Sequence, residues 1–134
     1  MNHILLITIS GEDQPGFTAG LTAILADHSV SILDIGQSVI HATLSLGLLV
    51  ELSENYAGEQ VVEAVRNFAL ERDLRAVTSV VSPESYSYWV EAQGLARYII
   101  TLLARKITSD QLARVTAVIS KHGLNIDSIN RLSG

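Results

Sequence analysis

The residues best suited to chemistry in this sequence lie in one short stretch, Gly11 to Phe17. The stretch holds two glycines, a proline, an amide and two carboxylates, between an apolar run and a segment with helical periodicity. Pro15 suits the first turn of a helix, because its missing N–H would be unpaired there in any case. Glycines let the backbone bend and approach a ligand closely. The stretch predicts a loop whose following helix start can hold a carboxylate or a phosphate, with a plain connector as the alternative.

Other residue patterns that mark enzymes are missing from the sequence. It has no cysteine, no Walker loop, no His-Glu-x-x-His and no Asp-x-Asp. None of the four histidines is spaced for metal binding with another ligand. We therefore expect no catalytic residue, no metal site and no cofactor in this chain.

Composition narrows the class of protein and its partners. The chain has 134 residues, of which 48% are hydrophobic, and a formal charge of −5. No apolar run reaches the roughly 18 residues that span a bilayer. Phosphate contacts supply most nucleic-acid affinity, and this acidic chain has no basic cluster. We expect a cytoplasmic protein that binds neither nucleic acid nor membrane, and RNA binding through a sheet is correspondingly disfavoured.

The helices and strands around the loop determine its position, and the periodicity of hydrophobic residues predicts where they lie. The order is strand, helix, strand, strand, helix, strand, over residues 3–10, 15–28, 30–40, 43–52, 58–72 and 74–81. The second and third strands should form a hairpin with a tight turn at His41-Ala42. In the second strand we expect Val30, Ile32, Asp34 and Gly36 on one face, Leu33, Ile35 and Val39 on the other, and a bulge near Gly36. Two crossovers sharing one antiparallel sheet predict a ferredoxin-like α/β (α+β) sandwich over residues 1–82.

The remaining chain predicts a linker helix and a second, partial unit. Ser82 and Pro83 open a short helix within residues 83–95. Residues 97–104 are predicted to form a strand. A capping box from Thr108 to Gln111 then begins a helix, which ends at Gly123. Residues 124–132 are predicted to form another strand. Residues 96–134 therefore correspond to the βαβ half of a unit.

An internal repeat relates the two parts. At an offset of 94 residues, Thr22 matches Thr116, His28 matches His122 and Ile32 matches Ile126 without gaps. Half a ferredoxin-like unit leaves a sheet edge unpaired. Either the unit is truncated from a longer protein, or a second chain completes it in a homodimer; the two are compatible, and we expect both.

Gly11-Glu12-Asp13-Gln14-Pro15-Gly16 resembles the G-x-D-x-P-G loop of ACT domains, and Leu124-Asn125-Ile126-Asp127 resembles their second strand. The segment 34–50 and residues 123–134 further resemble the tandem ACT region of bacterial phosphoserine phosphatases. This resemblance implies a ferredoxin-like module that binds an amino acid, with serine favoured, and that regulates a metabolic enzyme. The enzyme's catalytic domain, with its expected Mg, would lie outside this chain.

The resemblance also implies which residues bind. The ligand carboxylate or polar side chain would meet N–H groups at Gly16 and Phe17, and its ammonium would meet Asp13, Asp34, or an Asn125 or Asp127 of a neighbouring unit. The full set of expected ligand-binding residues is Gly11, Asp13, Gln14, Pro15, Gly16, Phe17, Asp34, Gln37, Asn125 and Asp127. The second copy has no glycine or proline at 105–108, so we expect it to scaffold the first copy rather than bind a ligand itself. A ligand-free dimerisation module and a free-standing tandem-ACT regulator of glycine metabolism remain alternatives.

Overall fold

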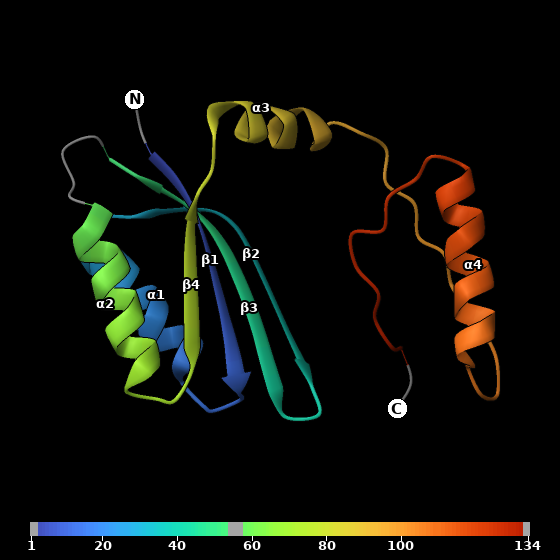
Figure 1. Cartoon of the computed structure of the whole chain (residues 1–134), viewed down its shortest axis with the longest axis horizontal. Coiled ribbons are helices and arrows are strands. Elements are labelled where there is room, and N and C mark those ends of the chain that lie inside the picture. The colour runs from blue at the N-terminus through green and yellow to red at the C-terminus, as the bar shows by residue number, and fades with distance from the viewer. Residues whose placement is uncertain (1–2, 54–57, 133–134) are drawn as a thin grey trace. The chain divides into compact units, whose positions relative to one another are not determined.

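The computed structural model of the chain describes residues 3–53 and 58–132. The chain divides into two compact units, residues 1–95 and 96–134. The first unit contains the predicted sheet and the short helix that follows it, and the second contains one long helix with its flanking segments (Figure 1). Each unit is described separately below.

The first unit is a four-stranded antiparallel sheet with two helices on one face (Figure 1). Its elements follow the predicted order: β1 His3–Glu12, α1 Phe17–Asp27, β2 Ser31–Ile40, β3 Thr43–Leu52, α2 Gly58–Leu70 and β4 Arg75–Val80. The strand order β2-β3-β1-β4 places β1 and β3 in the centre. This arrangement confirms the ferredoxin-like fold.

Periodic apolar residues build the core between the sheet and the helices. Alternate side chains of β1 and β3 are buried, and the helices bury residues spaced by four. In α1 these residues are Phe17, Leu21 and Leu25, and in α2 they are Val61, Val65 and Ala69. The buried face of each helix therefore fixes its rotation over the sheet, and with it the position of the loop that precedes α1.

The hairpin of β2 and β3 closes through a two-residue turn at His41 and Ala42, as the sequence predicts. Both residues have positive φ, 48° and 61°. Two-residue hairpins favour this left-handed conformation because it matches the twist of the strands. The turn is reached here without the glycine or asparagine that usually provides it.

The bulge predicted near Gly36 is wrong. The register instead shifts between Ile32, which pairs with Val50, and Asp34, which pairs with Leu49, so that Leu33 is the extra residue. An extra residue reverses the alternation of all side chains that follow it. Ile32 therefore shares the helix-facing side with Ile35, and Asp34 moves to the opposite face, contrary to the predicted alternation.

The linker helix α3, Pro83–Ala92, belongs to the first compact unit. The Ser82 side chain accepts a hydrogen bond from the Ser85 N–H at 3.1 Å, which confirms its predicted capping role. Tyr86 and Trp89 stack on the helix with ring centroids 5.9 Å apart.

The second unit contains helix α4, Ser109–Lys121, with the predicted capping box and with Gly123 at φ 72° after its end. No residue of α4, all of which the structure describes, is buried. The flanking segments 97–104 and 124–132 are not strands, which corrects the sequence prediction. In the first unit β3 lies between β1 and β2. Among the described residues of the second unit no strand corresponds to β3, so the copies of β1 and β2 have no strand between them with which to form a ladder.

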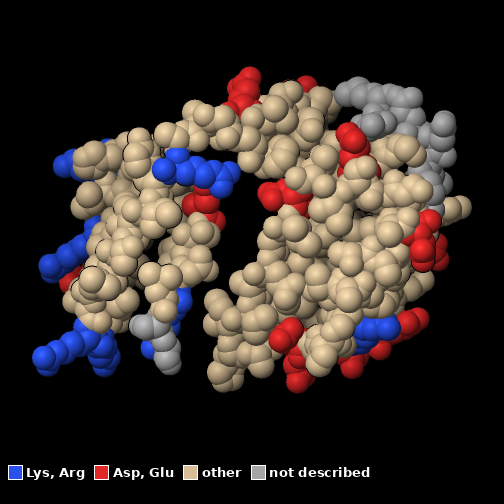
Figure 2. Space-filling model, turned by 180° about the vertical axis from the view of Figure 1, so that it is seen from behind, with Lys and Arg blue, Asp and Glu red and all other residues tan. Residues whose placement is uncertain are grey.

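Charge divides between the two units. Residues 1–95 carry 12 acidic and three basic side chains, a formal charge of −9, whereas residues 96–134 carry two acidic and six basic ones, a formal charge of +4. Figure 2 shows Lys and Arg gathered on the second unit and Asp and Glu on the first. Among the helices of the described residues, none is both long and apolar enough to cross a membrane.

Candidate functional site

A hollow of about 370 Å³ lies at the start of α1. Its lining comes from the β1–α1 loop, the first turn of α1 and the neighbouring strands β2 and β3: Asp13, Gln14, Pro15, Gly16, Phe17, Thr18, Ala19, Gln37 and Leu44. Small-molecule sites in proteins typically measure about 300–1,000 Å³. The hollow is therefore large enough for a small metabolite.

Backbone N–H groups at this helix start are left for a ligand. Gly16 occupies the cap position with φ 80° and ψ −1°, and no side chain caps the helix. The first helical hydrogen bond runs from the Gly20 N–H to the Gly16 carbonyl at 2.9 Å. The N–H groups of the first turn point out of the helix start, where they and the helix dipole favour an anion.

Two polar side chains flank these N–H groups. Asp13 is exposed and brings a carboxylate to the hollow. On β2, the Gln37 Oε1 accepts a hydrogen bond from the Thr18 hydroxyl at 2.6 Å. Because this bond uses the oxygen of Gln37, its amide N–H₂ can donate to a ligand. The hollow therefore offers both a cation partner and anion partners.

The structure brings six of the predicted residues together in this lining: Asp13, Gln14, Pro15, Gly16, Phe17 and Gln37. The Phe17 side chain is only 2% exposed, so it faces the core and offers the hollow its backbone. The Gln14 side chain reaches away to the Arg72 carbonyl, to which its Nε2 donates at 3.0 Å.

Sequence reasoning missed Thr18, Ala19 and Leu44. The first two follow Phe17 in the first helical turn. They could have been predicted, because they adjoin the N–H groups that the sequence already placed at the helix start. Leu44 gave no such signal, because its place in the lining depends on the pairing of β3 with β1.

Gly11 and Asp34 lie outside the lining. A Cβ atom on Gly11 would overlap the Leu74 side chain, so a glycine is needed there for packing at the start of β4. Asp34 and Gln37 are three residues apart on a regular stretch of β2, and they therefore face opposite sides of the sheet. The Asp34 Oδ1 accepts a hydrogen bond from the Ile35 N–H at 2.9 Å.

Asn125 and Asp127 belong to the second compact unit and are exposed. They lie in the segment that follows α4, which is the copy of β2 in the repeat. Across residues 3–53 and 58–132, no group of three or more His, Asp or Glu side chains is arranged to hold a metal ion.

Residues 3–79 match the ACT domain family. The chain is 33% identical over 129 residues to the phosphoserine phosphatase of Streptomyces coelicolor, covering 96% of this chain and 30% of that protein. It is 31% identical over 134 residues to phosphoserine phosphatase SerB2 of Mycobacterium tuberculosis, covering 96% of this chain and 31% of that protein. The chain thus spans about 30% of the length of these relatives.

Solved structures agree on the fold. An ACT domain protein from Streptococcus pneumoniae superposes with a TM-score of 0.52 at 20% identity, covering 58% of this chain and 89% of that one. The matched residues 3–79 hold all but the last residue of the sheet of the first unit, both helices that cover it, and the loop that forms the hollow. The chain therefore belongs to the ACT domain family.

Proposed function

We propose that this chain is a regulatory module that binds a free amino acid, serine foremost, in the hollow at the start of α1. The single observation that carries the proposal is the uncapped helix start at Gly16, with an exposed carboxylate and a carboxamide beside it. An amino acid carries a carboxylate and an ammonium a short distance apart. N–H groups of the α1 start suit the first of these, and Asp13 suits the second.

Gln37 adds selectivity in this proposal. Its side chain lies beside the first turn of α1, where it is bonded to Thr18, and its amide N–H₂ can donate to the hydroxyl of serine or to the ligand carboxylate. A donor that bonds the serine hydroxyl favours serine over analogues that lack a hydroxyl. Asn125 and Asp127 of a neighbouring ACT unit provide the second wall.

A thermal-shift series with single amino acids tests the binding. A ligand at about 100 times its dissociation constant stabilises the folded state by about 2.7 kcal/mol. We expect a shift with serine that Gly16→Ala removes. Gly123→Ala is the matched control, because Gly123 also has positive φ and open space around its Cβ position, yet lies outside the hollow. If no amino acid at millimolar concentration gives a shift, the chain is a ligand-free dimerisation module instead.

We further propose that two copies of the chain pair and that the second unit is completed in this assembly. Apolar side chains of its flanking segments are left uncovered in the single chain: Ile99 is 96% exposed, Leu103 87% and Leu132 82%. The opposite charges of the two units, −9 and +4, favour the approach of one copy's second unit to the other copy's first. Light scattering across a dilution series should give a dimer mass, and a monomer at micromolar concentration would contradict this pairing.

The relatives support a proposal for the activity of a longer parent protein. We propose that the chain is the regulatory part of a cytoplasmic phosphoserine phosphatase-like protein, in which serine shifts the balance between two arrangements of the dimer. The chain alone should not hydrolyse phosphoserine. Joined to the remaining region of the Streptomyces coelicolor relative, it should make the hydrolysis rate depend on serine. A serine-independent rate in a chimera that still binds serine would instead favour a free-standing regulator.

A further inference from the structure

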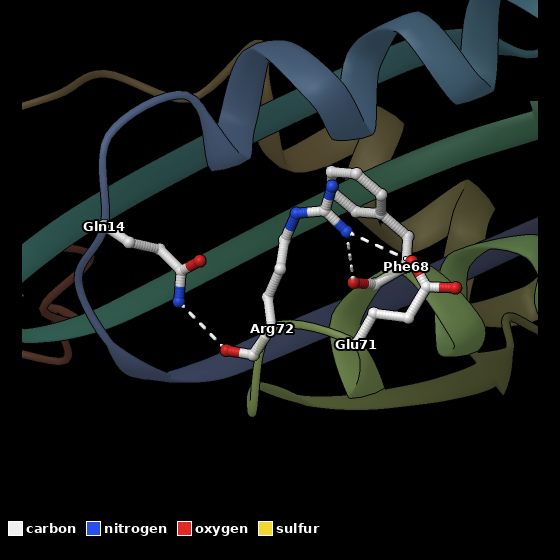
Figure 3. Close-up of polar contacts among 4 residues, drawn as sticks. All are labelled: Gln14, Phe68, Glu71 and Arg72. Atoms are coloured by element: carbon white, nitrogen blue, oxygen red, sulfur yellow. Dashed lines mark hydrogen bonds and ion pairs between the residues drawn. The ribbon is translucent and has the colours of Figure 1, made fainter.

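Gln14 lines the hollow, but its side chain is engaged elsewhere. Its Nε2 donates a hydrogen bond of 3.0 Å to the backbone carbonyl of Arg72, which lies 58 residues away in the turn between α2 and β4 (Figure 3). This bond connects the loop to the second crossover of the fold. One of the two N–H donors of the Gln14 amide is therefore engaged with this turn.

The same loop is held on its other side by the β2–β3 turn. The Asp13 N–H donates a hydrogen bond of 2.8 Å to the carbonyl of Ala42. Two consecutive residues thus tie the loop to two different turns, one through the backbone and one through a side chain. Pro15 and Gly16, which lead into α1, follow directly after these two anchors.

The acceptor of the Gln14 bond is itself fixed. The Arg72 guanidinium lies 3.7 Å from the centroid of the Phe68 ring, and its Nη1 donates to the Phe68 carbonyl at 3.1 Å (Figure 3). An ion pair to Glu71 at 3.5 Å is exposed and contributes little. The Phe68 ring in turn packs against Phe17, the first residue of α1, with centroids 5.2 Å apart. The turn that holds Gln14 is therefore linked to the start of α1 through Phe68.

We propose that Gln14 is a positioning residue, which preforms the hollow by fixing the loop against the α2–β4 turn. It acts through the backbone of Asp13, Pro15 and Gly16 and does not bind the ligand itself. The effect of this role on ligand affinity rests on the proposed amino-acid binding. Its effect on the loop can be measured without a ligand. Since a neutral hydrogen bond contributes about 0.5–1.5 kcal/mol net, its loss should weaken binding by about 2- to 12-fold.

Two substitutions separate positioning from direct binding. Gln14→Glu keeps the shape but places an acceptor opposite the Arg72 carbonyl, and we expect serine affinity measured by calorimetry to fall about tenfold. Gln14→Arg restores an N–H donor, and affinity should return to within about twofold of the original. Gln60→Glu, the same change at an exposed position of α2, controls for the added charge. If Gln14→Arg is as weak as Gln14→Glu, or Gln14→Glu binds normally, the positioning role is wrong.

Amide hydrogen exchange on the ligand-free protein gives the second readout. In Gln14→Glu the Asp13 amide, bonded to Ala42, and the Gly20 amide, bonded to Gly16, should exchange faster. The Val81 amide, bonded to Ile4 at the far end of β1, should not change. Equal acceleration at all three amides would indicate general destabilisation and overturn the proposal. A parent chain that binds no amino acid would defeat the proposed function alone, because the exchange pattern would still decide the role of Gln14.

Discussion

The starts of α1 and α4 occupy corresponding places in the repeat and differ in how their N–H groups are satisfied. In α4 the Thr108 hydroxyl accepts from the Gln111 N–H at 3.2 Å, and the Gln111 side chain accepts from the Thr108 N–H at 3.1 Å. At α1 no side chain caps the helix, and Gly16 turns the chain into it. One helix start is therefore closed by its own residues, and the other is left open towards a hollow.

The repeat also shows which residues made this difference. Offset by 94, Thr108 corresponds to Gln14, and Ser109, where α4 begins, corresponds to Pro15. The first helix begins two residues later, at Phe17. The side chain that caps α4 is thus replaced in the first unit by one that reaches across to Arg72. In the first unit the N–H groups at the helix start therefore have no side-chain cap, while the bond from Gln14 to Arg72 still holds the loop in place.

The bodies of the two helices remain alike. The Thr22 hydroxyl donates to the carbonyls of residues 18 and 19, and the Thr116 hydroxyl donates to those of residues 112 and 113, all within 2.9–3.1 Å. The Nδ1 atoms of His28 and His122 lie 2.8 and 2.9 Å from the carbonyl four residues before. These internal hydrogen bonds are therefore kept in both helices, whereas the helix starts differ.

The largest contrast should appear on the buried faces. Leu21 is fully buried, and Leu21→Ala should lower the free energy of unfolding by about 2–5 kcal/mol. Its counterpart Val115 is only half-buried in the single chain, so Val115→Ala should cost under about 1 kcal/mol. Urea unfolding at a dilution where light scattering gives a monomer measures both. Equal costs would show that α4 packs as deeply as α1 and would remove the contrast.

Removing the cap of α4 should have the next largest effect. Thr108→Ala removes the hydroxyl that accepts from the Gln111 N–H and should cost about 1 kcal/mol, seen as faster exchange of the Gln111 amide. Thr101→Ala, in the exposed segment before α4, is the control and should change little. Serine binding should be unaffected, and a loss of binding with Thr108→Ala would mean that α4 contributes to the site.

The ends of the two helices offer a sharper test of a single position. Ser29 has φ 55° where the second copy has Gly123 at φ 72°. Left-handed conformation costs a non-glycine residue about 1–2 kcal/mol, so Ser29→Gly should stabilise the first unit by about 0.5–1 kcal/mol after the entropy cost of glycine. Ser31→Gly, at the start of β2, should destabilise. Thermal unfolding checks both, and a lower melting temperature for Ser29→Gly would contradict this account.

The smallest difference should lie at the shared threonines. Thr22→Val and Thr116→Val each remove a hydroxyl that bonds back to the preceding turn. We expect changes in unfolding free energy that agree within about 0.5 kcal/mol, since both are modest changes on partly or fully exposed positions. A clear difference between them would show that the helix bodies have diverged as well.

Periodicity was sufficient to predict the elements of the first unit and the loop of the site. The spacing of Phe17, Leu21 and Leu25 fixed the buried face of α1, and the two glycines with Pro15 marked its start. Both signals lie within short stretches of sequence. The alternation of buried and exposed side chains along β1 and β3, which complete the core, can also be read within short stretches. The order of elements then left few topologies to choose from.

Features that depend on partners distant in the sequence could not be predicted. The bulge lies at Leu33 because of the register with β3, although Gly36 had the residue type that favours one. Asp34 consequently lies on the face opposite Gln37. Segments 97–104 and 124–132 have the composition of strands but no strand between them. The bond from Gln14 to Arg72 spans 58 residues, and no local signal announces it.

The close approach of α1 and α2 limits how far the two halves of the repeat could be exchanged. A Cβ atom on Gly20 would overlap the Phe68 ring, which is already enclosed by Phe17 and Arg72. The corresponding residue in α4 is Arg114, which pairs with Asp110 at 3.0 Å on an exposed surface. A chimera that grafts residues 109–121 in place of α1 would therefore set the Arg114 side chain against Phe68, which would have to shift.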